Sequence, residues 1–293
     1  MGNLIKAEFR KTLSLKTWWV LLIPLVLLGF GFSYVWGLLT NNFVNYIGGS
    51  DSDLIFRRVG IDVSKLPVGL LSIAHGVNVA MLIPALFGVF ALAGEYRNKT
   101  ISTTFLTAPN RLSALSAKMI TYIVWGVLYG VVSFAVAAIA TVVSVDGSHL
   151  PDVAQWLAAF GGTILASVLV TLFGIGFGAL LNNVTLAVVL LLVYFLIIEN
   201  TLTLVLWSDT TVLGAILPNG TSNGIVGGIA AGAFGINTLN LPPELSNGAQ
   251  YLVQQAAGAP GVVSWWASAL VFAAWTAALF GGGWAANQRR DIT

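Results

Sequence analysis

The sequence predicts an all-α, polytopic membrane protein with six transmembrane helices, from its composition and from the lengths of its apolar runs. Of the 293 residues, 57% are hydrophobic and only 8% are charged, whereas about 25% charged is usual in soluble domains. Several uncharged apolar runs reach the roughly 20 residues that a helix needs to cross a bilayer. We therefore expect a single transmembrane domain that covers residues 1–293.

Six apolar segments have the length of transmembrane helices. They cover residues 18–39, 70–93, 119–144, 153–181, 184–207 and 262–286. The stretch between Asp152 and Glu199 carries no charge and is too long for one helix. Asparagine disfavours helix interiors and tolerates tight turns. We therefore expect Asn182 and Asn183 to form a short turn between the fourth and fifth spans.

Glycines four residues apart occur in two of these spans, Gly126 with Gly130 and Gly174 with Gly178. This spacing places both glycines of a pair on one helix face, where a neighbouring backbone can approach closely. We expect close helix contacts at both pairs.

The basic residues lie mainly at one end of the predicted spans. Ten of them fall on one side of a six-span arrangement and three on the other. Because an excess of lysine and arginine marks the cytoplasmic face, we expect both termini and the segment 94–118 in the cytoplasm. The ten are Lys6, Arg10, Lys11, Lys16, Arg97, Lys99, Arg111, Lys118, Arg289 and Arg290, and the three are Arg57, Arg58 and Lys65.

Residues 1–17 have the pattern of a separate amphipathic helix. Ile5, Phe9 and Leu13 recur every four residues, and basic residues occupy a neighbouring stripe. Such a helix lies in the plane of the membrane surface, with its basic face toward anionic lipid. The alternative is a cluster of charge that only orients the first span.

The segment 208–261 is expected on the outer side, and its composition is not that of a solvated loop. It is rich in glycine, alanine and asparagine, with short apolar pieces at residues 212–217 and 225–234. These pieces are short for full spans, so we expect re-entrant or interfacial helices between spans five and six. A seventh and an eighth span are the alternative.

The chain lacks the residue patterns typical of enzymes and metal sites. It has no cysteine and only two histidines, His75 and His149, and neither belongs to a spaced ligand set. It also lacks the Gly-x-x-x-x-Gly-Lys-Ser/Thr phosphate loop that cradles nucleotides. We therefore expect no catalytic residue, no metal or cofactor bound by this chain, and no nucleic-acid partner.

One ionisable residue lies inside a predicted span. Placing the charge of Glu199 in a membrane costs on the order of 2.5–3.5 kcal/mol at a helix centre and less away from it. The functional interpretation is that Glu199 and Asn200 line a polar translocation path or couple transport to protons. The structural interpretation is that protonated Glu199 forms an interhelical hydrogen-bond set with Asn200 and Thr203.

Charge is otherwise concentrated between the second and third spans, in the segment 94–118. Its charged residues are Glu95, Arg97, Lys99, Arg111 and Lys118. The sequence from Gly94 to Ile101 is Gly-Glu-Tyr-Arg-Asn-Lys-Thr-Ile, followed by Thr-Thr-Phe-Leu at 103–106 and by Pro109. This pattern resembles the first cytoplasmic loop of ABC transporter permease subunits of the type 2 exporter class, which include bacitracin, daunorubicin and sodium exporter-like permeases.

The resemblance implies a mode of action. Such permeases have six spans with cytoplasmic termini, work as dimers, and are driven by separate ATPase subunits, which bind ATP and Mg. Their first loop forms a coupling helix that sits in a groove of the ATPase. The positions implied at this contact are Glu95, Tyr96, Arg97, Asn98, Lys99, Thr100, Ile101 and Arg111.

The sequence departs from the family pattern at two positions. Asn98 stands where a histidine is frequent, and Asn110 stands where a second basic residue is frequent. Neither change removes a key charge. The alternative reading of the segment is that its charges only prevent the flanking spans from sliding into the lipid.

We therefore expect a permease subunit in the bacterial plasma membrane that contacts lipid, an ATPase subunit, and a second permease subunit in a homodimer or heterodimer. Export is favoured because the outer segments have a membrane-associated composition. The substrate, a drug, a hydrophobic peptide or a lipid, is left open. Two alternatives belong to other classes: an ion-coupled carrier or channel that uses Glu199, and a non-transporting membrane scaffold.

Overall fold

The computed structural model describes residues 2–49, 62–97, 111–181, 183–205, 210–236 and 242–288. These residues form helices and no β-strand. Six helical stretches are long and apolar enough to cross a membrane, which confirms the predicted number of spans. They are α2 (Thr17–Gly48), α4 with α5 (Gly69–Ala80 and Leu82–Arg97), α7 (Arg111–Ser144), α8 (Val153–Leu181), α9 to α10 (Val184–Val193 and Glu199–Val205) and α14 (Trp265–Gln288).

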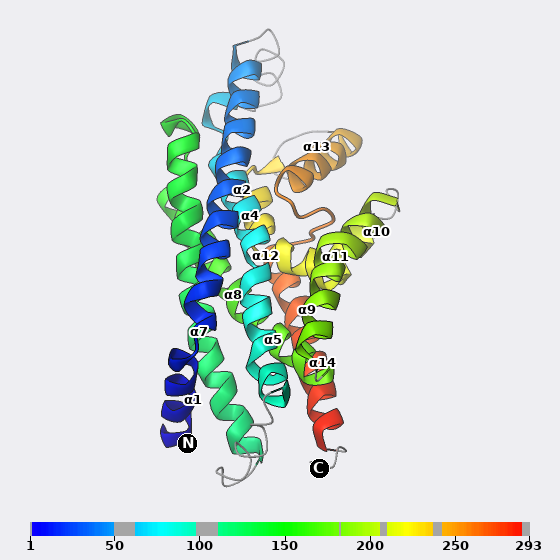
Figure 1. Ribbon diagram of the computed structural model, residues 1–293. Coiled ribbons are helices and arrows are strands. Elements are labelled where there is room, and N and C mark those ends of the chain that lie inside the picture. The colour runs from blue at the N-terminus through cyan, green and yellow to red at the C-terminus, as the bar shows by residue number, and fades with distance from the viewer. Residues whose placement is uncertain are drawn as a thin grey trace.

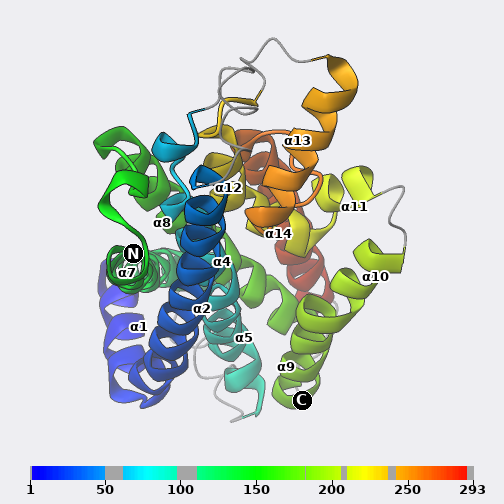
Figure 2. The same ribbon diagram turned by 90° about the horizontal axis from the view of Figure 1, so that it is seen from above.

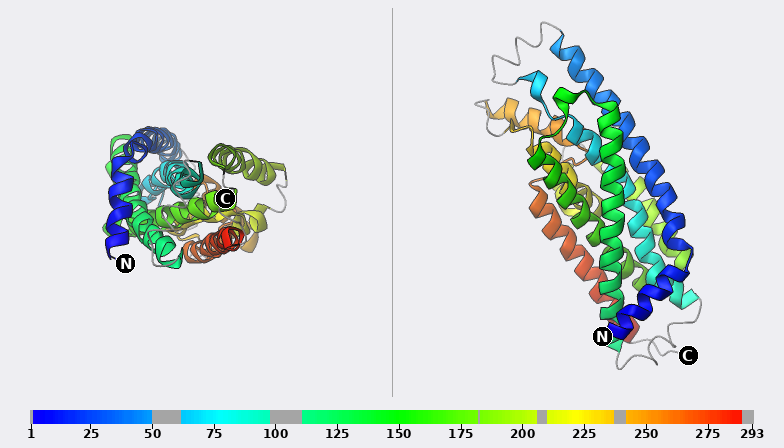
Figure 3. Two further views of the ribbon diagram at one scale, coloured as in Figure 1. Left: turned by 60° about the horizontal axis from the view of Figure 1, so that its bottom comes forward. Right: turned by 90° about the vertical axis from the view of Figure 1, so that its left-hand side faces the viewer.

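The long helices form an elongated bundle (Figure 1). The first helix, α1 (Gly2–Ser14), and the last turns of α14 lie at the same end, as an even number of spans requires (Figures 1 and 3). Seen along the bundle, α1 and α7 lie on one side, and α9 and α10 lie on the other (Figure 2). Between them α8 packs against α5, α7 and α14.

The turn between the fourth and fifth spans lies where the sequence predicts it. Helix α8 ends at Leu181 and α9 begins at Val184. The side chain of Asn183 accepts a hydrogen bond of 3.0 Å from the backbone N–H of Leu186. This N-cap satisfies one of the donors that the first turn of a helix leaves unpaired, so Asn183 both ends the apolar run and starts the next span.

Both predicted glycine pairs lie in close contacts within the chain. A Cβ on Gly126 or Gly130 of α7 would come within 2.9 Å of backbone atoms of α8. A Cβ on Gly174 of α8 would overlap the carbonyl oxygen of Ala85 on α5, and one on Gly178 would lie 2.8 Å from the carbonyl oxygen of Val89. Close approach of this kind lets spans pack without a hydrophobic driving force. These contacts hold α5, α7 and α8 together.

Three shorter helices lie between the fifth and sixth spans. They are α11 (Thr210–Ile216), α12 (Pro218–Gly232) and α13 (Pro243–Ala256). None of them is among the stretches long and apolar enough to span, so the alternative of a seventh and an eighth span is wrong for the described residues. Helix α12 is nonetheless largely buried, and it packs against α4, α8 and α14.

The face that α1 buries differs from the apolar stripe that the sequence predicts. Helix α1 packs against α7, and its buried residues are Glu8 and Thr12. Leu13 of the predicted apolar stripe is 55% exposed. The fully buried positions of the helix are therefore polar, while Phe9 of the predicted stripe is partly buried against the core.

At the other end of the bundle an aspartate joins α2 to the residues that follow α7. The side-chain amides of Asn45 and Asn41 donate to Asp146 Oδ2 at 2.8 and 3.1 Å. The backbone N–H of Asp146 returns a bond of 3.0 Å to Asn41 Oδ1. The hydrogen bonds from Asn45 and Asn41 hold the pKa of Asp146 below its ordinary value, because they favour the charged form.

Candidate functional site

The connection between the second and third spans is shorter than the segment 94–118. Helix α5 continues through Arg97 and α7 begins at Arg111, so that residues 94–97 and 111–118 are helical. Residues 98–110, which include Asn98, Lys99, Thr100 and Ile101, lie outside the described residues. Tyr96, Arg97 and Arg111 lie at the described helix ends, and their side chains are not described.

The predicted boundary of the loop is therefore corrected by the structure. The stretch after Arg111 contains leucine and alanine, which favour helix. Ala114, Leu115 and Ala117 are buried against the rest of the bundle. Burial of this apolar face extends α7 beyond the start of the predicted span 119–144, although the extension includes the charged Lys118.

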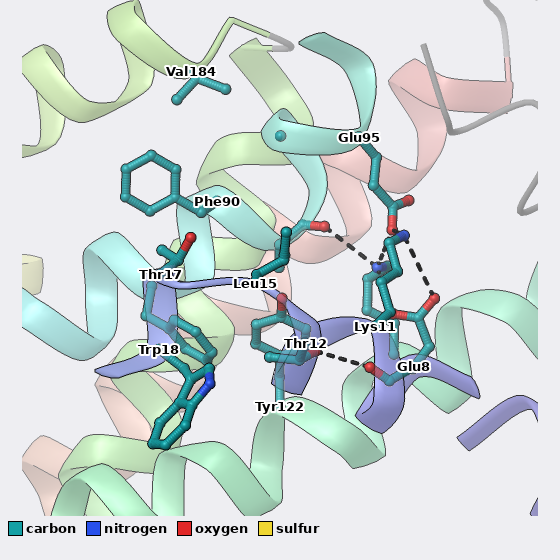
Figure 4. A pocket seen from close by; sticks show the side chains of 14 residues that line it. Glu8, Lys11, Thr12, Leu15, Thr17, Trp18, Phe90, Glu95, Tyr122 and Val184 are labelled. Atoms are coloured by element: carbon teal, nitrogen blue, oxygen red, sulfur yellow. Dashed lines mark hydrogen bonds and ion pairs between the residues drawn. The ribbon is translucent and has the colours of Figure 1, made fainter. Parts of the chain in front are cut away.

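At the base of α5 and α7 four charged side chains form one cluster, named here the ion cluster: Glu8 and Lys11 of α1, Glu95 of α5 and Lys118 of α7. Lys118 Nζ lies 2.6 Å from Glu95 Oε1 and 3.0 Å from Glu8 Oε2. It also donates to the carbonyl oxygen of Ala91 at 3.3 Å. Lys11 forms a second ion pair with Glu95 Oε1. Figure 4 shows Glu8 and Lys11 directed toward Glu95.

The ion cluster is balanced in charge and is shielded from solvent. The side chains of Lys118 and Glu95 are 3% and 4% exposed, and that of Glu8 is 10% exposed. Removing one partner of a buried pair costs about 3–5 kcal/mol, because the remaining charge is left uncompensated. The cluster therefore fixes the ends of α5 and α7 to each other and to α1.

One oxygen of the cluster has no partner. Glu95 Oε2 is buried and makes no hydrogen bond with any described residue. An unsatisfied buried acceptor costs about 1–3 kcal/mol, and more when it is charged, so such an atom is a candidate for binding a ligand. A partner protein, in contrast, would reach this carboxylate only if α1 moved away. The docking roles of Glu95 and the residues after it remain predictions.

Sequence reasoning did not find the ion cluster. The predictions used Lys11 to orient the spans, placed Lys118 in the connecting segment, and gave Glu8 no role. One signal was present: Glu8 is the sole acidic residue among the first 50, on a segment with four basic residues. A lone acid on a basic amphipathic helix indicates a specific ion pair, but its close partner, Lys118, is 110 residues away.

A cavity of about 380 Å³ lies beside the ion cluster, between α1, α5 and α7, and is named here the α1 cavity. One part of its wall is charged and another is apolar and aromatic (Figure 4). The residues that line it include Leu15, Trp18, Phe87, Phe90, Gly94 and Val184, together with the ion cluster.

A second polar site surrounds Glu199, within the fifth span. The residue is 2% exposed. Its carboxyl group accepts hydrogen bonds from the backbone N–H groups of Asn219, at 2.9 Å, and Gly220. These donors belong to the first turn of α12, where a helix has unpaired N–H groups and a positive end of its dipole. Glu199 thus anchors the buried end of α12 to the fifth span.

The backbone just before Glu199 is irregular. Residues Tyr194–Ile198 form a π-helical turn between α9 and α10. Such turns are rare and occur frequently at functional sites. The carbonyl oxygen of Phe195, in this turn, accepts a hydrogen bond of 3.3 Å from the side-chain amide of Asn219. The π-helical turn therefore contributes to the same contact with α12.

Glu199 makes interhelical hydrogen bonds, as the structural interpretation expected, but the expected partners are wrong. Asn200 donates to the carbonyl oxygens of Phe195 and Leu196, both at 3.1 Å. Thr203 donates to the carbonyl oxygen of Glu199 at 3.0 Å. Both side chains thus bond within their own span, and α12 supplies the interhelical bonds. Sequence spacing could not reveal these donors because they are backbone groups.

A small cavity of about 160 Å³ adjoins this site. Its polar lining consists of His75, Asn78, Asn200, Asn219 and Asn223, from three different helical segments. The ring of His75 stacks on that of Trp36, with the centroids 3.7 Å apart. Polar side chains inside a membrane are rare and mark pathways or sites. The translocation role of Glu199 and Asn200 stays a prediction, and this polar lining is compatible with it.

No protein-family model and no curated protein matches the chain. Among the described residues, no three histidine or acidic side chains are grouped as a metal site would require. The two polar sites and the connection between α5 and α7 are therefore the candidate functional features of the chain.

Proposed function

We propose that the chain is the permease subunit of an ATP-driven exporter of the ABC type. The observation that carries the proposal is the ion cluster, which joins the helices on either side of the connection 98–110 to each other and to α1. A connection anchored in this way can transmit a displacement instead of absorbing it. The resemblance of residues 94–101 to a coupling loop supports the same proposal.

In this proposal an ATPase subunit, which binds ATP and Mg, docks on the connection and on the adjoining helix ends, which carry Tyr96, Arg97 and Arg111. Movement of the docked segment displaces α5 and α7 together, because Lys118 and Glu95 pair across them. The displacement reaches α8 through the close glycine contacts on both helices. A second permease subunit completes the path across the membrane.

The same proposal places the chain in the bacterial plasma membrane, with both termini in the cytoplasm. The basic residues near α1, in the connection and after α14 support this orientation. Helices α11 and α12 would then form a re-entrant pair on the outer side. The hydrogen bond of 2.7 Å from Trp275 to the carbonyl oxygen of Ile216 supports a turn at the depth of mid-span six.

Docking is tested with Arg97→Ala combined with Lys99→Ala, which leaves the ion cluster intact. We expect the amount of copurifying ATPase subunit to fall by roughly tenfold or more. Removing one member of a charge pair at an interface leaves the charge on the other protein buried and unpaired. Recovery of the complex is measured by affinity purification from membranes, and ATP hydrolysis is measured on the purified complex.

The matched control is Arg57→Ala with Arg58→Ala, which removes two charges on the side predicted to face outward. It should leave the complex unchanged. An Arg97 and Lys99 variant that keeps a normal ATPase complex and normal ATP hydrolysis would contradict the docking proposal. A complex that forms without any flux of substrate would instead favour the scaffold alternative.

The polar cavity beside Glu199 supports an ion-coupled carrier as the second candidate function. Glu199→Gln distinguishes the two candidates. The amide keeps one acceptor and turns an NH₂ group toward a backbone N–H, so we expect the free energy of unfolding to fall by about 1–3 kcal/mol. Thr203→Val, which removes only a bond within the span, is the matched control for stability.

Proton flux into liposomes that contain this chain alone is the functional measurement. The exporter predicts no flux above empty liposomes for either wild type or Glu199→Gln. A wild-type flux that disappears in Glu199→Gln but persists in Thr203→Val would favour the carrier and overturn the exporter. Denaturant unfolding of the same preparations separates lost stability from lost function.

A further inference from the structure

The α1 cavity combines an unpaired acceptor with a partly free donor. An ammonium group has three N–H donors, and Lys118 uses them on Glu8, Ala91 and Glu95. Lys11 is different, since its side chain is 37% exposed and has one close carboxylate, Glu95 Oε1. Glu95 Oε2 has no partner among the described residues. Glu95 and Lys11 both line the cavity, so a ligand there meets a carboxylate that lacks one partner beside an ammonium that is partly exposed.

The rest of the wall is suited to hydrocarbon. Leu15, Trp18, Phe87, Phe90 and Val184 line the cavity on the side away from the charges. Apolar surface of this kind is covered favourably by methylene groups. A ligand that fits both walls has a small zwitterionic part joined to an apolar chain.

The cavity lies where lipid headgroups are expected. The first membrane-length segment begins at Thr17, and the second ends at Glu95. Both residues line the cavity. Trp18, which follows directly, is of the residue type enriched at membrane interfaces. Leu15, 48% exposed, marks a route by which an acyl chain can leave toward the bilayer.

We infer that the α1 cavity binds a phospholipid whose headgroup carries a primary ammonium, as phosphatidylethanolamine does. The ammonium donates to Glu95 Oε2, the phosphate accepts from Lys11, and the first part of the acyl chains covers Phe90 and Trp18. This inference does not depend on the proposed function, because it concerns only α1, α5, α7 and the membrane. It gives α1 a lipid ligand in addition to its contact with α7.

The chemistry discriminates among bilayer lipids. Phosphatidylcholine has the same charges and chains, but its trimethylated nitrogen has no N–H to donate to Glu95. Phosphatidylglycerol supplies the phosphate for Lys11 and no cation. A hydrogen bond to a charged group changes binding by roughly tenfold or more, so we expect a preference of that size for phosphatidylethanolamine.

The test uses the full chain, freed of lipid in detergent and then offered equal amounts of the three lipids with identical acyl chains. Native mass spectrometry counts the lipid that remains bound. Wild type should retain phosphatidylethanolamine roughly tenfold over phosphatidylcholine. Glu95→Gln, which replaces an acceptor by a donor, should lose this preference.

A second variant leaves the ion cluster untouched. Gly94 lines the cavity, and a Cβ there would meet no atom within 4 Å. Gly94→Leu should therefore fold, occupy the cavity and abolish the retained lipid. Gly31→Leu is the matched control, because Gly31 also has open space and lies on α2 outside the cavity.

Three results would overturn the inference. The first is equal retention of phosphatidylethanolamine and phosphatidylcholine by wild type. The second is a preference that survives in folded Gly94→Leu. The third is displacement of the lipid by soluble phosphoethanolamine at an equal concentration, which would show that a free amine, and not a lipid, occupies the site.

Discussion

Lys118→Met is expected to lower the free energy of unfolding by about 3–5 kcal/mol, the cost of leaving buried charges without a partner. Methionine has a similar length and no charge, so the cavity left behind is small. Glu8 and Glu95 then face each other with only Lys11 between them, and Lys11 is partly exposed. Unfolding in mixed micelles, followed by circular dichroism against denaturant concentration, measures the change.

Two companion variants make this result specific. Lys65→Met removes a lysine whose side chain is 82% exposed in its pair with Asp62, and it should leave stability unchanged. Adding Glu8→Gln and Glu95→Gln to Lys118→Met should recover much of the lost stability, because neutral replacement of buried charges that pair with one another is often tolerated and the remaining charge, Lys11, is 37% exposed. A Lys118→Met protein as stable as wild type would show that the cluster does not hold these helices together.

Gly174→Ala is expected to lower the free energy of unfolding by about 1–3 kcal/mol, and Gly174→Leu is expected to prevent folding. The new Cβ would overlap the carbonyl oxygen of Ala85. Backbone cannot move aside as a flexible side chain can, so α5 and α8 must separate. The contact is reciprocal, since Gly88 of α5 meets backbone atoms of α8 around Gly174.

Gly161→Ala is the control on the same helix. A Cβ on Gly161 would meet no atom within 4 Å. Alanine is favoured over glycine in a helix by roughly 0.8–1.0 kcal/mol, so this variant should be as stable as wild type or slightly more stable. Similar losses in Gly161→Ala and Gly174→Ala, measured by the same unfolding experiment, would contradict a close α5–α8 contact.

The span arrangement was predictable from the sequence to a large extent. Hydropathy located six segments, and the structure has six helical stretches of membrane length. Boundaries were less accurate: α2 runs to Gly48 and α7 begins at Arg111, beyond the apolar core of each segment. Packing and helix propensity extend a helix past the point where its apolar residues end. A hydropathy pattern shows only the apolar residues, so it underestimates the length of the helix.

The polar sites were predictable only in part. Glu199 was recognisable because a charge in an apolar run is conspicuous, but its partners were not. Its donors from α12 are the backbone N–H groups of Asn219 and Gly220, which almost any residue would supply at the start of a helix. The π-helical turn before it likewise has no distinct residue pattern in the run from Tyr194 to Ile198.

The sequence by itself determined that this chain is an all-helical protein with six membrane-length segments, and it located the charged segment between the second and third. Those properties depend on apolar runs and on individual charges, which can be read locally. Only the tertiary structure decided that Glu95 and Lys118 are buried together with Glu8 and Lys11 of α1. Whether a charge faces solvent or an opposite charge depends on which distant helix packs beside it, and that contact is set by the whole bundle.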